Sequence, residues 1–104
     1  MARFEVFENP NRGTRKLVPF LLDVQSDLLD PLSTRVVVPL IAASEFGKPA
    51  SRLNPQFEIG GIAVVMSTAE LAGVSMAAIG SKVLSLEECR DEITAALDIL
   101  FTGF

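Results

Sequence analysis

The stretch "LVPFLLDVQSDLLDPLSTRVVVPLIA", residues 17–42, decides the fold because two apolar runs flank a short polar segment. Residues 17–25 predict a strand, in which Pro19 belongs at a bulge or at an unpaired edge position. Residues 35–42 are rich in β-branched side chains and predict a strand buried on both faces. Asp30-Pro31 is a typical turn dipeptide. The stretch therefore predicts two strands of an antiparallel sheet.

The rest of the chain continues this pattern. Residues 3–8 alternate and predict a strand with Phe4 and Val6 on one face, followed by a flexible loop. Residues 55–59 and 62–67 predict two strands joined by a turn at Gly60-Gly61. Residues 43–54 are expected to be irregular, residues 67–73 to form a short helical turn and residues 74–83 to close the sheet.

The last twenty residues predict an amphipathic helix. Ser85 and Glu88 fit a capping box, in which Ser85 accepts from the third helical amide and Glu88 bonds back. Gly103 is a typical C-terminal stop. One apolar stripe recurs at three- and four-residue spacings and consists of Leu86, Cys89, Ile93, Leu97, Leu100 and Phe101. We expect a mainly β domain over residues 1–104, with five or more antiparallel strands followed by one C-terminal α-helix.

Composition limits where the protein works. Hydrophobic residues make up 49% of the 104, which is a high fraction for one small domain. No window approaches the roughly 18 unbroken apolar residues of a membrane span, and residues 1–10 lack the apolar stretch of a signal peptide. We therefore expect a cytoplasmic protein with no membrane contact, in which the excess apolar surface forms an oligomer interface or a docking site.

Missing residue types exclude several kinds of chemistry. The chain has no His, which excludes histidine triads and His-ligated zinc. Its single cysteine, Cys89, excludes an internal disulfide and a Cys-rich metal site, and lies in the apolar stripe, where a buried structural role is expected. No Gly-rich phosphate loop occurs. We expect neither a metal nor a cofactor.

Charge is unevenly distributed. The formal net charge is −4, and residues 85–104 carry five acidic residues against Arg90 alone. The one compact basic cluster is Arg12, Arg15 and Lys16. Phosphate neutralisation needs a larger basic face, so we do not expect this chain to bind nucleic acid by itself.

Three aspartates and two leucines in "DVQSDLLD", residues 23–30, invite a functional interpretation. A carboxylate cluster for metal or acid–base work is one hypothesis. The other, which the spacing favours, is that Asp27 and Asp30 cap the turn while Asp23 and Gln25 bond to the backbone. For Leu28 and Leu29, a core position for one of them and an exposed contact patch are both open. Arg35 is expected to be a solvated charge or the partner of an aspartate.

Residues 20–40, "FLLDVQSDLLDPLSTRVVVPL", closely resemble the signature segment of the CcdB toxins, the gyrase poisons of bacterial toxin–antitoxin modules. The start "RFEVFENP", residues 3–10, and the end "ITAALDILFTGF", residues 93–104, also match the family. The resemblance implies an SH3-like small barrel of the CcdB/MazF kind with an appended small antiparallel sheet. It also implies a homodimer that pairs around the C-terminal helices, and it tips the alternatives for Leu28 and Leu29 towards exposure.

The same resemblance implies partners and site residues. A CcdB toxin is not an enzyme: it binds the A subunit of DNA gyrase and traps the cleaved-DNA complex. By resemblance, the gyrase-binding residues are Leu28, Leu29, Asp98, Thr102, Gly103 and Phe104. Thr102 differs from the Trp of the best-known member and lacks a ring that could stack on a gyrase arginine.

An antitoxin of the CcdA kind neutralises such a toxin, and the complex of the two represses its own operon, so that DNA is reached only through the complex. The residues implied to bind the antitoxin are Asn9, Arg12, Arg15 and Lys16.

Two other functions remain open at this point. MazF-like ribonuclease toxins use the same barrel and need neither a metal nor a His; Thr34 and Arg35 supply residue types for that chemistry. The acidic balance and the missing basic groove disfavour it. The second is an inactive dimer that only binds its antitoxin and acts as a corepressor.

Overall fold

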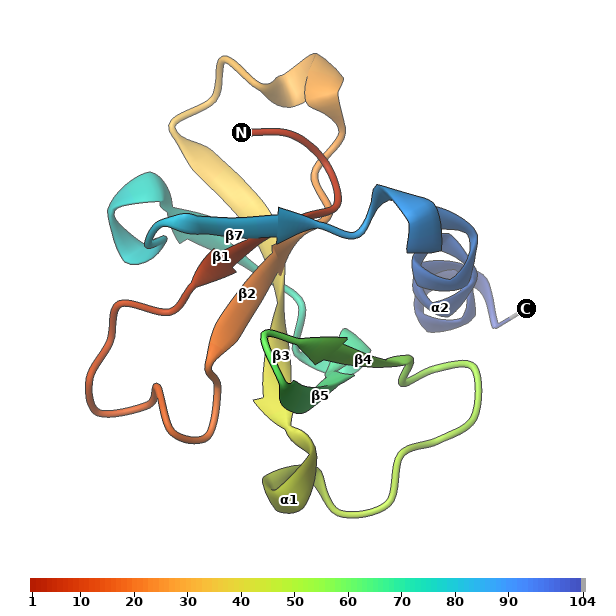
Figure 1. Ribbon diagram of the computed structural model, residues 1–104. Coiled ribbons are helices and arrows are strands. Elements are labelled where there is room, and N and C mark those ends of the chain that lie inside the picture. The colour runs from red at the N-terminus through yellow and green to blue at the C-terminus, as the bar shows by residue number, and fades with distance from the viewer. Residues whose placement is uncertain (104) are drawn as a thin grey trace.

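The computed structural model describes residues 1–103, which form one curled antiparallel sheet with a helix beside it (Figure 1). The strands are β1 (Glu5–Glu8), β2 (Phe20–Asp23), β3 (Thr34–Ala42), β4 (Gln56–Ile59), β5 (Ile62–Met66), β6 (Ala72–Ser75) and β7 (Lys82–Ser85). The helices are α1 (Ala43–Phe46) and α2 (Arg90–Thr102), and single 3₁₀ turns are η1 (Asp27–Leu29), η2 (Thr68–Glu70), η3 (Met76–Ala78) and η4 (Glu87–Cys89). The predicted class, mainly β with a C-terminal helix, is confirmed.

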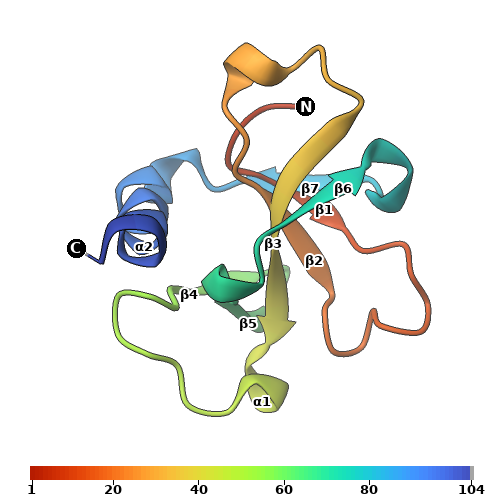
Figure 2. The same ribbon diagram turned by 180° about the vertical axis from the view of Figure 1, so that it is seen from behind.

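Strand β3 is the centre of the sheet. The strand order is β4-β5-β3-β2-β1-β7, and all pairs are antiparallel. On its second side β3 pairs with β6 along its first half and with β5 along its second half. The sheet curls into a half-barrel, from which the β4–β5 hairpin extends as the small appended part (Figure 2). This agrees with the small-barrel fold expected from the resemblance.

Pro39 lies inside β3, where a missing N–H would ordinarily break the ladder. It falls between the segments that pair with β6 and with β5. Its carbonyl accepts from the amide of Ser67, while the carbonyl of Ser67 accepts from Glu70 in η2. The acceptor that a residue with an N–H would have used is thus already occupied, so proline is tolerated in the middle of the sheet.

Most of the apolar stripe of α2 packs inside the protomer. Ile93 and Leu97 are buried in the core, with Ala96 beside them, and Leu86 and Cys89 pack against its edge. The same core contains Phe4, Val6, Phe20, Leu22, Val24, Val38, Leu40, Ile59, Val64 and Met66. The end of the stripe lies outside this core, because Leu100 is half-buried and Phe101 is 69% exposed.

The ends of the final helical segment differ in how well they were predicted. Ser85 Oγ accepts from the amide of Glu87 at 3.1 Å rather than from Glu88, and η4 begins after Leu86, which makes no side-chain cap bond, so the predicted capping box is wrong. At the other end, Gly103 has φ +82° and its N–H donates to the Ile99 carbonyl at 3.0 Å. That left-handed conformation favours glycine, and the predicted stop is confirmed.

Other local expectations were met in part. Gly60 and Gly61, both with positive φ, form the two-residue turn of the β4–β5 hairpin, and residues 68–70 form the short helical turn. Residues 74–83 are not one closing segment, because η3 separates β6 from β7. Residues 43–46, expected to be irregular, form α1. No helix in the described part of the chain is both long enough and apolar enough to span a membrane.

Candidate functional site

The turn over residues 24–33 connects β2 to β3 and presents three leucines to solvent, Leu28, Leu29 and Leu32. Leu28 is 90% exposed and Leu29 48%, and no residue of η1 is buried. Ser26 Oγ accepts from the Leu28 amide at 3.3 Å and thereby caps η1. The exposure of Leu28 and Leu29 is as the resemblance implied.

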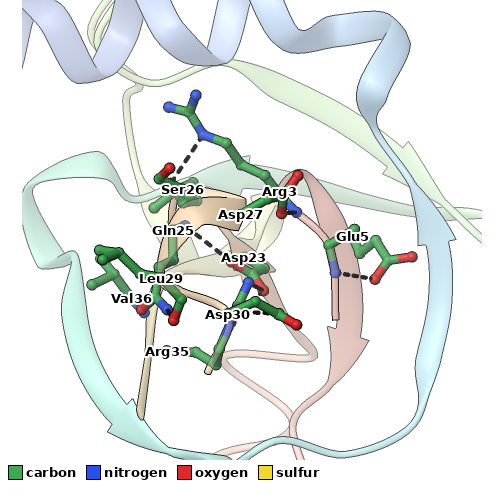
Figure 3. Close-up of polar contacts among 12 residues, drawn as sticks. Arg3, Glu5, Asp23, Gln25, Ser26, Asp27, Leu29, Asp30, Arg35 and Val36 are labelled. Carbon is green, nitrogen blue, oxygen red and sulfur yellow. Dashed lines mark hydrogen bonds and ion pairs between the residues drawn. The ribbon is translucent and has the colours of Figure 1, made fainter. Parts of the chain in front are cut away.

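A buried arginine ties this turn to the sheet (Figure 3). The Arg35 side chain is 1% exposed, and its Nε and Nη2 both donate to Asp23 Oδ2, at 2.9 and 2.6 Å. Its Nη1 donates to Asp30 Oδ1 at 2.9 Å, and the Asp30 side chain is 54% exposed. Of the two expectations for Arg35, an aspartate partner is confirmed and a solvated charge is wrong.

The remaining polar groups of the turn are also occupied. Gln25 Nε2 donates to the Leu29 carbonyl at 3.0 Å, and its Oε1 accepts from the Val36 amide at 3.0 Å. Asp27 Oδ1 accepts from the Arg3 amide at 2.9 Å. Asp27 and Asp30 therefore do not cap the turn as predicted, because both bond to residues outside it, whereas Gln25 does bond to the backbone.

The Asp23 carboxyl is fully buried, and this burial raises its pKa above the ordinary value. Hydrogen bonds from Arg35 and from the Gln25 amide, the latter at 3.0 Å to Oδ1, act in the opposite direction. A fully buried carboxylate whose two oxygens accept three hydrogen bonds holds a structure together and is inaccessible to a substrate. Asp23 is therefore a structural residue, and no group of three metal-binding side chains occurs in residues 1–103.

A groove of about 440 Å³ lies between this turn and α2. Leu29 from the turn and Asp98 and Phe101 from α2 all border it. Its other lining residues are Arg3, Val24, Gln25, Ser26, Val36, Leu71, Thr94 and Leu97. Two predicted gyrase-binding positions that are 69 residues apart in the chain, Leu29 and Asp98, thus meet at one surface.

The C-terminal end of α2 adjoins that groove. Thr102 and Gly103 are exposed, and the Thr102 hydroxyl donates to the Asp98 carbonyl at 2.6 Å, so its proton is already used within the helix. Phe104, the last predicted contact residue, lies outside the described residues. Phe101 and Arg3 border the groove but were not predicted as site residues. No local signal set Phe101 apart, because adjacent helical residues such as Leu100 and Phe101 both fit an apolar stripe about 100° wide.

The four residues predicted to bind the antitoxin lie at the other end of β2, in the loop over residues 9–19. Asn9 is 7% exposed, and its Nδ2 donates to Thr14 Oγ1 at 3.0 Å and to the Val18 carbonyl at 2.8 Å. Arg15 Nε donates to the Asn9 carbonyl at 3.3 Å. Asn9 therefore organises the loop from inside. Backbone bonds also join Asn11 to Thr14 and Arg15, and Thr14 to Leu17 and Val18, while Arg12 and Lys16 are exposed.

Two further grooves flank that loop. One of about 530 Å³ lies between the loop and η3, and is bordered by Asn9, Val18 and Ala77. The other, of about 360 Å³, is bordered by Arg15, Lys16 and Phe20. The predicted site residues therefore form two groups at opposite ends of β2, one acidic and apolar and one basic.

The family model described as CcdB protein matches residues 3–103, nearly the whole chain. This protein belongs to the CcdB family. With that membership it belongs to the toxins of toxin–antitoxin modules, as the segment at residues 20–40 had indicated.

One solved structure similar to it is an endoribonuclease in complex with its cognate antitoxin from a mycobacterial species, with a TM-score of 0.74. The match covers 96% of this chain and 93% of that one at 12% identity, so the likeness concerns the fold.

Proposed function

We propose that this CcdB-family toxin poisons DNA gyrase by binding its A subunit and trapping the cleaved-DNA complex. The observation that carries the proposal is the groove that unites Leu29, Asp98 and Phe101 beside the exposed end of α2. A contact site built from exposed leucines and an exposed phenylalanine matches the composition of a protein-binding surface. Phe101 supplies there the aromatic ring that Thr102 does not.

The direct test is a chain that ends at Phe101, compared with the full chain. Removal of residues 102–104 breaks the hydrogen bonds that the Thr102 hydroxyl and the Gly103 amide donate to the helix. The free energy of unfolding should therefore change by roughly 1 kcal/mol or less. The shortened chain keeps the groove but loses Phe104, which by resemblance inserts into gyrase. A phenylalanine buried in an interface contributes about 2–3 kcal/mol, so trapping should be lost. Linear plasmid after denaturation measures the trapped complex, and melting temperature measures the fold.

Glu92→Ala is the matched control, since it alters an exposed residue of the same helix outside the groove. It should melt and trap like the full chain. A shortened chain that still traps gyrase would place the poison elsewhere on the surface, for instance at Leu28 and Leu29. Thr102→Trp is the companion variant and should strengthen trapping if ring stacking on a gyrase arginine is what Thr102 lacks.

The ribonuclease alternative rests on the fold likeness alone. Arg35, the residue considered for that chemistry, is 1% exposed and donates to two aspartates, so no face of its guanidinium is free for a phosphate. Thr34 is exposed, but its neighbour Arg35 is paired with Asp23 and Asp30 and supplies no free cation beside it. Intact chromosomal DNA together with cut mRNA in poisoned cells would nevertheless establish the ribonuclease and reject gyrase poisoning.

Three partner proposals accompany the gyrase proposal. The basic loop over residues 9–19 would dock an acidic segment of a CcdA-like antitoxin, and the resulting complex would bind operator DNA in the cytoplasm. The third partner is a second copy of the chain, with α2 at or next to the two-fold axis. Light scattering tests it: a folded monomer at micromolar concentration would contradict the homodimer.

A further inference from the structure

Leu28 derives almost nothing of its position from packing, and Leu29 is only half covered. η1 contains no buried residue, and Leu28 has only a tenth of its side-chain surface covered. A single 3₁₀ turn is also too short to be stable by itself. Something other than burial must therefore hold the pair in one place, and the polar contacts around the turn are the available candidates (Figure 3).

Arg35 is the fixed point among those contacts. Two of its nitrogens donate to the same buried oxygen, Asp23 Oδ2, so the guanidinium plane is held by strands β2 and β3. Its third donor, Nη1, is thereby fixed as well and bonds to Asp30, the residue directly after Leu29. The N–H donors of a guanidinium lie in one plane in a fixed arrangement, so two bonds to Asp23 also fix the direction of the third donor.

The main chain next to the leucines is held on both sides. Gln25 Nε2 bonds to the carbonyl of Leu29, while the Asp30 amide bonds to the carbonyl of Asp27 at 3.2 Å. Gln25 is itself held by the Val36 amide. Of these contacts, only the one to the Asp30 side chain has a half-exposed partner, and its removal takes one acceptor from Arg35 Nη1 while both bonds from Arg35 to Asp23 remain.

We infer that Asp30, held by Arg35, is a positioning residue that fixes the backbone of the turn so that Leu28 and Leu29 are presented beside the groove. Its effect on gyrase binding rests on the proposed function, whereas its effect on the turn does not. Preorganisation of this kind lowers the ordering cost of binding. The prediction is a loss of order and of affinity without a matching loss of global stability.

The experiment compares Asp30→Ala and Asp30→Asn with the unaltered chain. Asn keeps an oxygen that can accept from Arg35, whereas Ala keeps none. The control is Glu87→Ala. Glu87 has a similar exposure and pairs with Arg90, far from the turn in the sequence. Hydrogen exchange at the amides of Leu28, Leu29 and Asp30 measures the turn, and binding to a gyrase A fragment measures the consequence.

Asp30→Ala should speed exchange at these three amides by roughly tenfold, as expected from one lost charge-assisted bond, and should weaken gyrase binding by a similar factor. Asp30→Asn should keep most of the slow exchange and most of the gyrase affinity of the unaltered chain. Glu87→Ala should change neither the exchange rates nor the affinity. Unchanged exchange in Asp30→Ala would overturn the inference. So would faster exchange over the whole sheet, which indicates a general loss of stability. If the unaltered chain does not bind gyrase A, the proposed function fails, and the exchange rates alone decide the role of Asp30.

Discussion

The two connections at the ends of β2 show how one strand serves two different surfaces. The loop over residues 9–19 contains three basic residues and no acid, and the turn over residues 24–33 contains two aspartates and no base. They lie at opposite ends of β2 (Figure 1). Each is organised by a buried polar side chain, Asn9 in the loop and Arg35 beneath the turn.

The two buried side chains, which we call anchors, differ in which neighbouring groups they leave exposed to solvent. Asn9 satisfies the backbone of its own loop, which leaves the cations Arg12 and Lys16 outside. Arg35 uses charge to hold Asp30, which leaves the leucines outside. A basic surface and an apolar surface suit different partners, and their separation would let an antitoxin segment reach one of them while the other is occupied.

Removal of the anchor beneath the turn should have the largest effect. Arg35→Ala leaves the fully buried Asp23 without its cation, and should lower the free energy of unfolding by about 3–5 kcal/mol. Urea denaturation measures the loss. The matched control is Arg90→Ala, which breaks an exposed pair and should cost under about 1 kcal/mol. Equal effects of the two substitutions would contradict the structural role of the buried pair.

Removal of the anchor inside the loop should cost less, because Asn9 is uncharged. Asn9→Ala leaves the Val18 carbonyl and the Asn11 amide without their partners, and should cost about 1–3 kcal/mol. Trypsin should then cut faster within residues 12–16. Asn11→Ala, which loses an exposed bond to the Gly13 amide, is the control and should have a smaller effect. A loop that resists trypsin equally well in both variants would show that other bonds hold it.

The basic side chains of the loop should affect the rate of association with the antitoxin more than the stability of the complex. Arg12→Ala with Lys16→Ala spares Arg15, whose Nε supports the loop backbone. This double variant should associate more slowly with the antitoxin at low salt, while the dissociation rate changes little. Stopped-flow mixing at two salt concentrations measures both rates. An association rate equal to that of the unaltered chain at low salt would remove the loop from the proposed antitoxin contact.

The exposed leucines of the turn should matter little for folding. Leu28→Ser should change the free energy of unfolding by less than about 0.5 kcal/mol, because the side chain is 90% exposed. Leu22→Ala, at a fully buried position in the adjacent strand, should cost about 2–5 kcal/mol. A large cost for Leu28→Ser, measured by the same denaturation, would mean that a second copy covers this leucine in solution.

An ion pair outside both connections should give the smallest effect. Glu5 Oε2 lies 2.6 Å from Lys82 Nζ between β1 and β7, and the hydrogen bond to Lys82 lowers the pKa of Glu5 below its ordinary 4.5. A lowered pKa contributes stability above pH 4.5 and loses it as pH falls through the folded-state pKa. Glu5→Gln should therefore flatten the decline of stability below pH 4.5. Parallel pH curves for the two proteins would contradict this.

Much of the fold was predictable because the signals for it are local. The period of residues 86–101 predicts a helix, and Gly60-Gly61 predicts the turn of the β4–β5 hairpin, since both depend on neighbours in the chain. The exposure of Leu28 and Leu29 followed from the resemblance rather than from periodicity. The helical turns α1 and η3 were missed, since a single turn carries too little periodicity to be recognised.

The candidate site was less predictable, because its geometry depends on residues that are far apart. Spacing favoured a capped turn over a carboxylate cluster for Asp23, Asp27 and Asp30, and it gave no sign of which aspartates pair with Arg35. The answer came from strand register, which sets Asp23 opposite Val37 and brings Arg35 underneath the turn. The exposure of Phe101 was not readable from the sequence for a related reason: a stripe identifies the apolar side of a helix but not where the core ends.

The sequence by itself determined the element types, the family and the chemistry that is absent, since composition and short spacings are sufficient for those. The tertiary structure decided which polar groups are anchors and which are contacts. Asn9 and Arg35 became structural residues because folding buried them, and burial forces a polar group to find partners. Leu29 and Asp98 became neighbours because α2 packs next to the turn. Burial and proximity across 69 residues result from the packing of the whole chain, which no short stretch of sequence specifies.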